Sequence, residues 1–324
     1  MHFISIPDNF ADLSQGLVYR MDAEAEGRSI DVIVRDIATG RQVATSRFFD
    51  TRIMEIDIAP YVMRMFDPQP ADKVPGLNLP QGRTVDITVQ ADGLSSVARR
   101  YSMLRPQRPQ FITTMPANRA LSRGQHDEIA LFAPDGGVLK IVDDSDDSQA
   151  VIASLDIPAG EQPFVFTLTA DAIAKDDCGM ADIKLVLETA GAHDEIFYLV
   201  TDIDEKADGC RLAWLSSQGS IERYTFPVRL ENRRTVKKKR WYAGDGYGSH
   251  TILDERSVML LSHFEPAAVV EALGEIIASE AVWLEKDGHN IPVDVVTSEH
   301  RIEHGAAPNS LMLEIRAARR EVAL

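Results

Sequence analysis

The segment FEPAAVVEALGEIIASEAVWLEKDGHNIPVDVV, residues 264–296, decides the fold class of the C-terminal part of the chain. Its first half has helical periodicity, because apolar residues recur on one face: Val269, Leu273, Ile276 and Ile277. Pro266 suits the first position of a helix, and Ser262 with Glu265 has the spacing of a capping box. We therefore expect one amphipathic helix over residues 266–279.

Strand signals follow this helix. The short apolar run AVWLE at residues 281–285 precedes Asp287-Gly288, which is a typical two-residue hairpin turn. Period-two alternation then marks two further strands through Ile291, Val293, Val295, Leu311, Leu313 and Ile315. The order helix, strand, turn, strand, strand predicts an α+β domain over residues 209–324.

The preceding two-thirds of the chain has mainly strand patterns. Alternating apolar residues at 30–34 and 85–89 predict a β-sandwich-like domain over residues 1–105, with a polar, proline-bearing loop at 67–81. Short apolar runs separated by turn residues predict a second β-sandwich-like domain over residues 110–202. The expected fold class is mainly β, with tandem β-sandwich domains followed by a C-terminal α+β domain.

A weak internal repeat connects the two predicted sandwiches. At an offset of 108 residues, similar side chains coincide: Ile33 with Ile141, Val34 with Val142, Val43 with Val151 and Ser46 with Ser154. Tandem duplication of one sandwich accounts for this pattern, and so do two unrelated sandwiches with similar hairpins.

Composition narrows the class of protein. The formal net charge of −16 argues against a general nucleic-acid binder. The sequence contains no apolar run long enough for a membrane-spanning helix, and its first residues do not resemble a secretory signal, so no membrane role is expected. Cys178 and Cys210 are too few for a disulfide framework, and we expect two reduced thiols in a protein made in the cytoplasm.

One segment of the C-terminal domain carries a family resemblance. RLAWLSSQG at residues 211–219, followed by YTF at 224–226, resembles an RLxWxNSxGG-like segment of tail-associated structural proteins encoded by Bacteroidetes phages and prophages. Ser216 and Ser220 depart from the usual Asn and Gly. Later counterparts of the same family pattern are Pro266 to Ser279, Val282-Trp283-Leu284, Ile291-Pro292-Val293 and Ala317-Ala318-Arg319.

The resemblance covers about a third of the chain closely, and the remainder only by its β-rich architecture. It implies a structural role in a virion or tail-like particle, with synthesis in the bacterial cytoplasm before assembly. The partners that the resemblance implies are other tail or virion proteins and further copies of this chain. It supplies no catalytic residue and no cofactor.

Two polar motifs suggest metal chemistry. His300-Arg301-Ile302-Glu303-His304 spells HxxEH, in which His300 and His304 would hold zinc from one face of a helix. The flanking residues lack a helical apolar face, so a polar loop is the expected structure. The tripeptide His-Asp-Glu occurs at residues 126–128 and 193–195, and we interpret both copies as polar loop residues entering strands.

A basic run interrupts this acidic sequence. It lies on an expected strand and ends in two aromatic residues, and its candidate partner-contact residues are Arg233, Arg234, Lys237, Lys239, Trp241 and Tyr242. Basic residues beside aromatic ones can bind nucleic acid, but alternation along a strand would split this run between two faces. Contact with an acidic neighbouring copy or tail protein, or a solvated strand, is the preferred interpretation.

The sequence therefore predicts a non-enzymatic structural protein of a phage tail or prophage-derived assembly, acting through protein–protein association and forming a homo-oligomer within it. A carbohydrate-binding or adhesin module is the alternative, which exposed clustered aromatic residues, including Trp241, Tyr242 and Tyr247, would favour. A zinc hydrolase that uses His300 and His304 is the third hypothesis.

Overall fold

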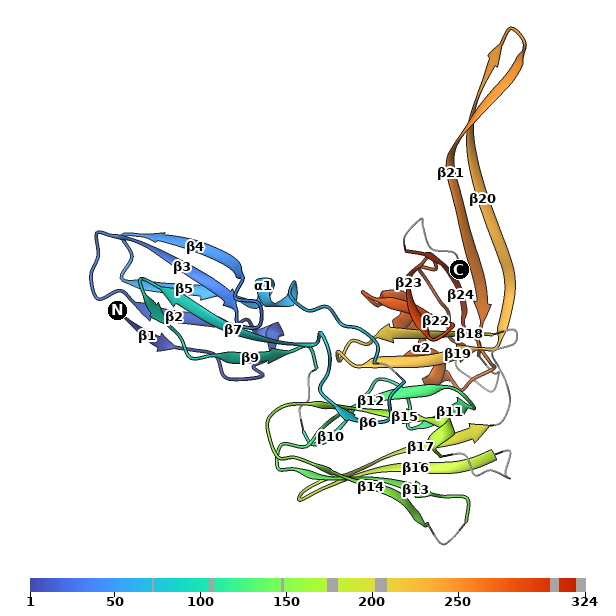
Figure 1. The fold of residues 1–324 in the computed structure, drawn as a ribbon, viewed down its shortest axis with the longest axis horizontal. Helices are drawn as coiled ribbons and strands as arrows, with labels where there is room; N and C mark the ends of the chain where they lie inside the picture. Colours follow the sequence, from blue (N-terminus) through green and yellow to red (C-terminus); the bar gives the residue numbers. More distant parts are fainter. Residues whose placement is uncertain are drawn as a thin grey trace.

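A computed structural model describes residues 1–71, 73–104, 108–146, 149–173, 180–201, 209–303 and 309–318. Two β-sandwiches are followed by a seven-stranded sheet with one long helix, so the predicted fold class is confirmed (Figure 1). Each of the three units has its own main cluster of buried apolar side chains.

The N-terminal sandwich packs a three-stranded sheet, in the order β1-β2-β5, against the sheet β4-β3-β7-β8, in which β9 also pairs with β7. Ile30, Val32 and Val34 alternate into its core as predicted. Its elements are β1 (His2–Ser5), η1 (Leu13–Gln15), β2 (Val18–Asp22), β3 (Ser29–Asp36), β4 (Gln42–Phe49), β5 (Ile53–Asp57), α1 (Ala59–Met63), β7 (Thr84–Ala91), β8 (Leu94–Ser95) and β9 (Arg99–Ser102).

The middle sandwich consists of the sheets β10-β12-β15-β6 and β11-β17-β16-β13-β14. Only the pair β11–β17 is parallel among the pairings within these two sheets. The elements are β6 (Gly76–Asn78), β10 (Gln110–Ile112), β11 (Asn118–Ser122), β12 (His126–Phe132), β13 (Gly137–Asp143), β14 (Val151–Ile157), β15 (Phe164–Thr169), η2 (Ala170–Ala172), β16 (Met180–Thr189) and β17 (His193–Thr201).

Strand β6 corrects one prediction. The sequence predicts only a loop over residues 67–81, but β6 pairs with β15 in the middle sandwich, with Leu77 opposite Phe166. Leu77 packs against the core of that sandwich. A three-residue strand is too short to show a period-two pattern, so tertiary pairing decides its structure.

The internal repeat corresponds to two similar hairpins. β3 and β4 pair Ile33 with Thr45, and β13 and β14 pair Ile141 with Ala153, which is the same register at the same offset. Both hairpins shift register on the turn side of these pairs, after Val34 in β3 and after Ile141 in β13. The equivalence applies to the hairpins, and it leaves open whether whole domains were duplicated.

The C-terminal sheet has the strand order β19-β18-β22-β23-β24-β21-β20, and helix α2 contributes to its main core. Its elements are β18 (Cys210–Leu215), β19 (Ile221–Phe226), β20 (Val228–Ala243), β21 (Gly246–Leu261), α2 (Ala267–Ala278), β22 (Val282–Lys286), β23 (His289–Val295) and β24 (Met312–Ala317). The predicted turn is present: Asp287 and Gly288 both have positive φ, at 51° and 77°. These values suit the turn type that joins twisted antiparallel strands.

The predicted helix forms, but the predicted capping box does not. Helix α2 begins at Ala267, and Pro266 precedes it in an extended conformation without a side-chain cap. The Ser262 hydroxyl instead accepts a hydrogen bond from the backbone N–H of Leu311, at 2.8 Å. The Glu265 carboxylate accepts one from the Tyr224 hydroxyl, at 2.9 Å. Both side chains therefore fasten neighbouring segments to each other rather than capping the helix.

Among the described residues, no helix combines the length and the apolar character needed to cross a bilayer.

Candidate functional site

The most prominent surface feature is the distal part of the β20–β21 hairpin, residues 234–256, which we call the arm. Among the described residues, strand β24 pairs with β21 only from Ser257 to Leu261, and the two arm strands pair only with each other. The arm extends from the C-terminal sheet into solvent, away from both sandwiches (Figure 1). At about 3.4 Å per residue, its ten paired residues on β20 extend over roughly 30 Å.

Among the arm residues whose side chains the structure describes, none is buried. Residues on both of its faces are exposed, which includes Val236 at 41% and Trp241 at 50%. A two-stranded ribbon without a covered face is only marginally stable in water. An ion pair near its base strengthens it. The Arg234 guanidinium donates to both oxygens of Asp254, at 2.8 and 2.6 Å. Burial against a partner would supply the covered face that the arm lacks.

Aromatic residues gather near the arm tip. Tyr242 and Tyr247 face each other across the strands with ring centroids 5.2 Å apart, and they are 69% and 84% exposed. Trp241 lies opposite Gly248 with its indole ring over that glycine, where an added Cβ would come within 2.4 Å of the ring. An aromatic side chain over a cross-strand glycine is a known stabilising device of β-ribbons.

The charge of the arm is opposite to that of the chain. The arm contains six basic and three acidic residues, a net charge of +3, whereas the whole chain carries −16. Arg233, at the arm base, pairs with Glu231 and Glu314, and Arg234 pairs with Asp254. In the part of the chain that the structure describes, Lys237, Lys239 and Arg240 form no ion pair. These three cations are therefore available to a partner.

The predicted partner-contact residues thus all lie on one strand. Arg233 lies at the base of β20, and Arg234, Lys237, Lys239, Trp241 and Tyr242 follow along the arm. Alternation does split the basic run between two faces, as the sequence predicts. The sequence does not predict that both faces are free, because a strand pattern gives no information about what packs against it.

A second group of charged residues is buried where the three units meet. The Arg83 guanidinium, from the N-terminal sandwich, pairs with Glu128 on β12, and both side chains are almost fully buried. Glu128 also lies 3.6 Å from the Arg223 guanidinium on β19. On β18, the Arg211 guanidinium pairs with Asp127. These arginines and carboxylates form an interdomain ion-pair network.

Glu285 on β22 completes this network. Its carboxylate accepts a hydrogen bond from Arg223 at 2.8 Å and lies 3.4 Å from Arg211. Burial alone would raise the pKa of Glu285, but the two arginines outweigh it and hold the pKa below its ordinary value. Glu285 is therefore held as the anion that matches two buried cations.

His126 lies at the edge of the same network. Burial, together with the positive charge of Arg223, lowers the pKa of His126 to about 4. Its Nε2 atom lies 3.3 Å from the carbonyl oxygen of Ala71. Because a carbonyl only accepts, the neutral ring donates from Nε2. His126 therefore contributes a neutral hydrogen bond between β12 and the segment that precedes β6.

The structure corrects the interpretation of the first His-Asp-Glu tripeptide. His126, Asp127 and Glu128 do stand at the start of strand β12, but they are buried residues of the network and not loop residues. In the second tripeptide, exposed His193 pairs locally with Glu195. The described residues contain no group of three or more His, Cys, Asp or Glu side chains that could hold a metal ion.

Sequence patterns missed the network for a physical reason. β18 has one charged residue, Arg211, and β19 has two adjacent ones, Glu222 and Arg223, among mostly apolar residues. A few charged residues in a strand are also compatible with one face in solvent. Here β12 contacts β19, and Arg211 and Arg223 are buried between the sheets. The signal that could reveal them is the presence of opposite charges at strand positions in separate domains.

The HxxEH motif lies only partly within the described residues. Residues 300–303 form no helix, and His304 lies outside the described part of the chain. The imidazole of His300 lies over Gly274 on α2, where an added Cβ would come within 2.4 Å of the ring. His300 therefore packs against the helix. Cys210 is buried with a free thiol, and Cys178 also lies outside the described residues.

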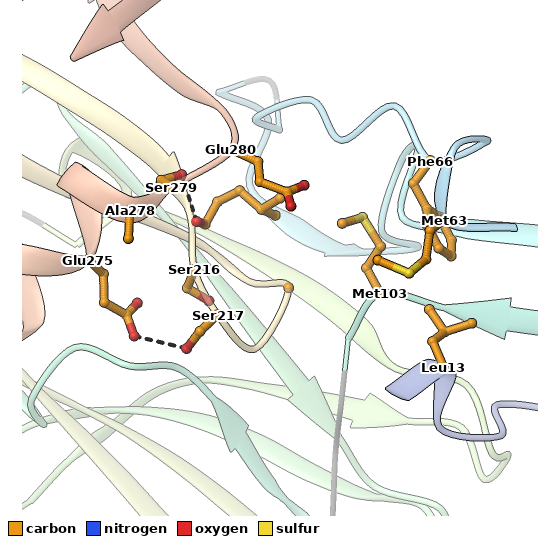
Figure 2. Close-up of a pocket in the computed structure, with 12 residues that line it drawn as sticks. Leu13, Met63, Phe66, Met103, Ser216, Ser217, Glu275, Ala278, Ser279 and Glu280 are labelled. Carbon is orange, nitrogen blue, oxygen red and sulfur yellow. Dashed lines mark hydrogen bonds between the residues drawn. The ribbon is translucent and has the colours of Figure 1, made fainter. Parts of the chain in front are cut away.

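A pocket of about 230 Å³ lies between the N-terminal sandwich and the C-terminal domain (Figure 2). One wall is apolar and comes from the N-terminal sandwich: Leu13, Met63, Phe66 and Met103. The opposite wall is polar and comes from the C-terminal domain: Ser216, Ser217, Glu275, Ser279 and Glu280. We call this the junction pocket.

Gly219 brings the two walls of the junction pocket together. It has a φ of 81° in the turn between β18 and β19. An added Cβ would lie 2.4 Å from the carbonyl oxygen of Met103, so only glycine permits this approach. Gly219 belongs to the segment that carries the family resemblance, and its conformation shows why a glycine is needed there.

No protein-family model and no curated protein matches the chain. Among solved structures, the chain is similar to extracellular domains 3–5 of Drosophila OTK, at 7% identity and a TM-score of 0.26, covering 80% of this chain and 91% of that one. The titin I-band fragment I67–I69 gives 10% identity, a TM-score of 0.20 and coverage of 80% and 92%. Domains 1–6 of the surface layer protein SbsC give 11% identity and a TM-score of 0.21, covering 84% of this chain and 33% of that one. TM-scores this low carry no argument about function.

Proposed function

We propose that this chain is a non-enzymatic structural protein of a phage tail or a prophage-derived tail-like assembly. The observation that supports association is the arm, whose described side chains are not buried on either face and whose Lys237, Lys239 and Arg240 form no ion pair in the described structure. A ribbon of this kind gains its missing burial and charge compensation when a second polypeptide covers it. The family resemblance of the C-terminal segment supports the particular setting.

The rest of the molecule suits a scaffold. Three units are joined to one another by buried ion pairs. In the described part of the chain, the charged groups of the interdomain network are committed to each other. None of them is left as an activated nucleophile or base.

The proposed place of this chain in a tail-like assembly is tested on purified particles. After prophage induction in the source strain, tail-like particles are purified by density centrifugation and their proteins identified by mass spectrometry. The proposal predicts this chain in the particle fraction, and genes for capsid, portal and tape-measure proteins near its own gene. Its consistent absence from purified particles, with the free protein left in the lysate, would overturn the tail assignment.

A carbohydrate-binding module is the second candidate, because Trp241, Tyr242 and Tyr247 are exposed together near the arm tip. Exposed aromatic rings can stack on apolar sugar faces. A glycan array distinguishes the candidates: specific binding that is lost in Trp241→Ala and Tyr247→Ala supports a carbohydrate reader. An array with no binding eliminates this candidate and leaves protein association in place.

A further inference from the structure

We infer that the arm tip of one copy docks into the junction pocket of a second copy of this chain. This inference rests on the proposed function, and it names the partner of the arm and the site that receives it. It follows from three properties of the junction pocket: its uncompensated carboxylates, its methionine-rich wall and its size.

The polar wall carries two carboxylates that lack cations. Glu275 accepts hydrogen bonds from the hydroxyls of Ser217, at 2.9 Å, and Thr114, at 2.8 Å, and both donors are neutral. Glu280 is exposed at the pocket rim. Within the described residues, neither carboxylate forms an ion pair, and no basic side chain lines the pocket. A cation therefore suits this wall.

The facing wall suits an aromatic group. Met63 and Met103 present their thioether groups beside Phe66 and Leu13, across the pocket from Glu275 (Figure 2). Sulfur–aromatic contacts are favourable, and flexible methionines adapt to an inserted ring. At about 230 Å³, the pocket is smaller than the roughly 300–1,000 Å³ typical of sites for drug-sized ligands. One or two side chains fit better than a free metabolite.

The arm tip supplies both groups at once. Trp241, Tyr242 and Tyr247 present aromatic surface, and Lys239 and Arg240 stand next to them on β20 without ion pairs in the described structure. An aromatic side chain would meet the methionine wall while a basic one meets Glu275 or Glu280. Charge and apolar character therefore match on both sides of the contact.

The contact must be between molecules. The arm extends away from the N-terminal sandwich and from the helix α1 that carries Met63 (Figure 1). Its tip cannot enter the pocket of its own chain without bending back over the body. Because tip and pocket are different surfaces, the contact is head-to-tail. Such contacts close into rings or continue as filaments.

The test uses two full-length variants. The pocket variant carries Glu275→Gln and Glu280→Gln, and the tip variant carries Trp241→Ala and Tyr247→Ala. We expect each to weaken self-association at low salt by about 30-fold or more, measured by sedimentation velocity across a concentration series. A control variant with Glu271→Gln and Glu26→Gln has the same net charge as the pocket variant, and it should assemble like the wild type.

Mixing the two variants sharpens the test. The pocket variant keeps an intact tip and the tip variant keeps an intact pocket, so the mixture should form heterodimers and no larger assembly. If the pocket variant assembles like the wild type, or if the wild type stays monomeric, the docking inference is overturned. Failure of the tail assignment gives a different result. The chain is then absent from purified particles, whether or not the purified chain self-associates in solution.

Discussion

The interdomain network and the arm use charged residues in opposite ways. Arg83, Arg211 and Arg223 are buried, and each has a carboxylate partner from another unit of the same chain. Lys237 and Lys239 are exposed on a ribbon that extends away from the body, without ion pairs in the described structure. The first set of charges joins parts of one molecule. The second set remains free to join molecules.

Mutations in the two groups of charged residues should therefore have different effects. A buried charge that loses its partner remains desolvated, so breaking the network should reduce the stability of the fold. Removing an exposed charge that has no ion-pair partner in the described molecule should leave the stability of the fold unchanged. The removal should weaken only the contact with a second molecule.

Glu128→Gln should have the largest effect on stability. The substitution keeps the shape of the side chain but leaves Arg83 and Arg223 without their shared buried anion. We expect the free energy of unfolding to fall by about 3–5 kcal/mol, measured by denaturant titration. The control is Asp31→Asn, which removes an exposed partner of Arg47. An equal loss in both variants would contradict the distinction between the two kinds of ion pair.

His126 should make the junction sensitive to acid. Its pKa is lowered from 6.5 to about 4 in the folded chain. The stability contributed by the neutral ring is therefore complete above 6.5 and is lost as the pH falls towards 4. Between pH 7 and pH 4, the wild type should lose about 3 kcal/mol more than His126→Gln. Parallel pH profiles of unfolding free energy would show that folding does not lower the pKa of His126.

Gly219→Ala tests the close approach at the junction pocket. Gly93 is the matched control, because its φ is 80° and an added Cβ there meets no atom within 4 Å. Both substitutions incur the cost of a left-handed alanine, but only the one at Gly219 also collides with Met103. We expect an additional loss of about 1–3 kcal/mol at Gly219. Equal thermal shifts would mean that the turn can move away.

The smallest effect on stability is expected on the arm. Lys237→Gln with Lys239→Gln should leave the unfolding midpoint unchanged, because neither cation has an ion-pair partner within the described molecule. The same variant should associate more weakly, and its association should depend less on salt than that of the wild type. A clear loss of stability would show that these lysines support the fold itself.

Several elements of the fold could be predicted from the sequence. Helix α2, the Asp287-Gly288 turn and the strands of both sandwiches follow from local periodicity and turn chemistry, which act over a few residues. Strand β6 and the cap of α2 could not be predicted, because distant partners decide them: β15 pairs with β6, and Leu311 binds Ser262.

The candidate site was predictable only in part. The run of basic and aromatic residues can be found in the sequence as a local excess of positive charge in an acidic chain, and the structure places it on the arm. Within the described residues, the arm pairs with no other element because β24 stops pairing with β21 at its base, which no local pattern encodes. The interdomain network was missed because Asp127 and Arg211 come together only when two sheets pack.

The most direct test of the account removes the arm. Replacing residues 237–253 by Asn-Gly joins Val236 to Asp254, which lie opposite each other in the register, through a turn suited to that connection. The solution mass is then measured by light scattering at low and high salt. The account predicts that the full-length chain exceeds the mass of one chain at low salt and approaches it at high salt, whereas the shortened chain is a folded monomer throughout. Equal masses for both chains at low salt would contradict it.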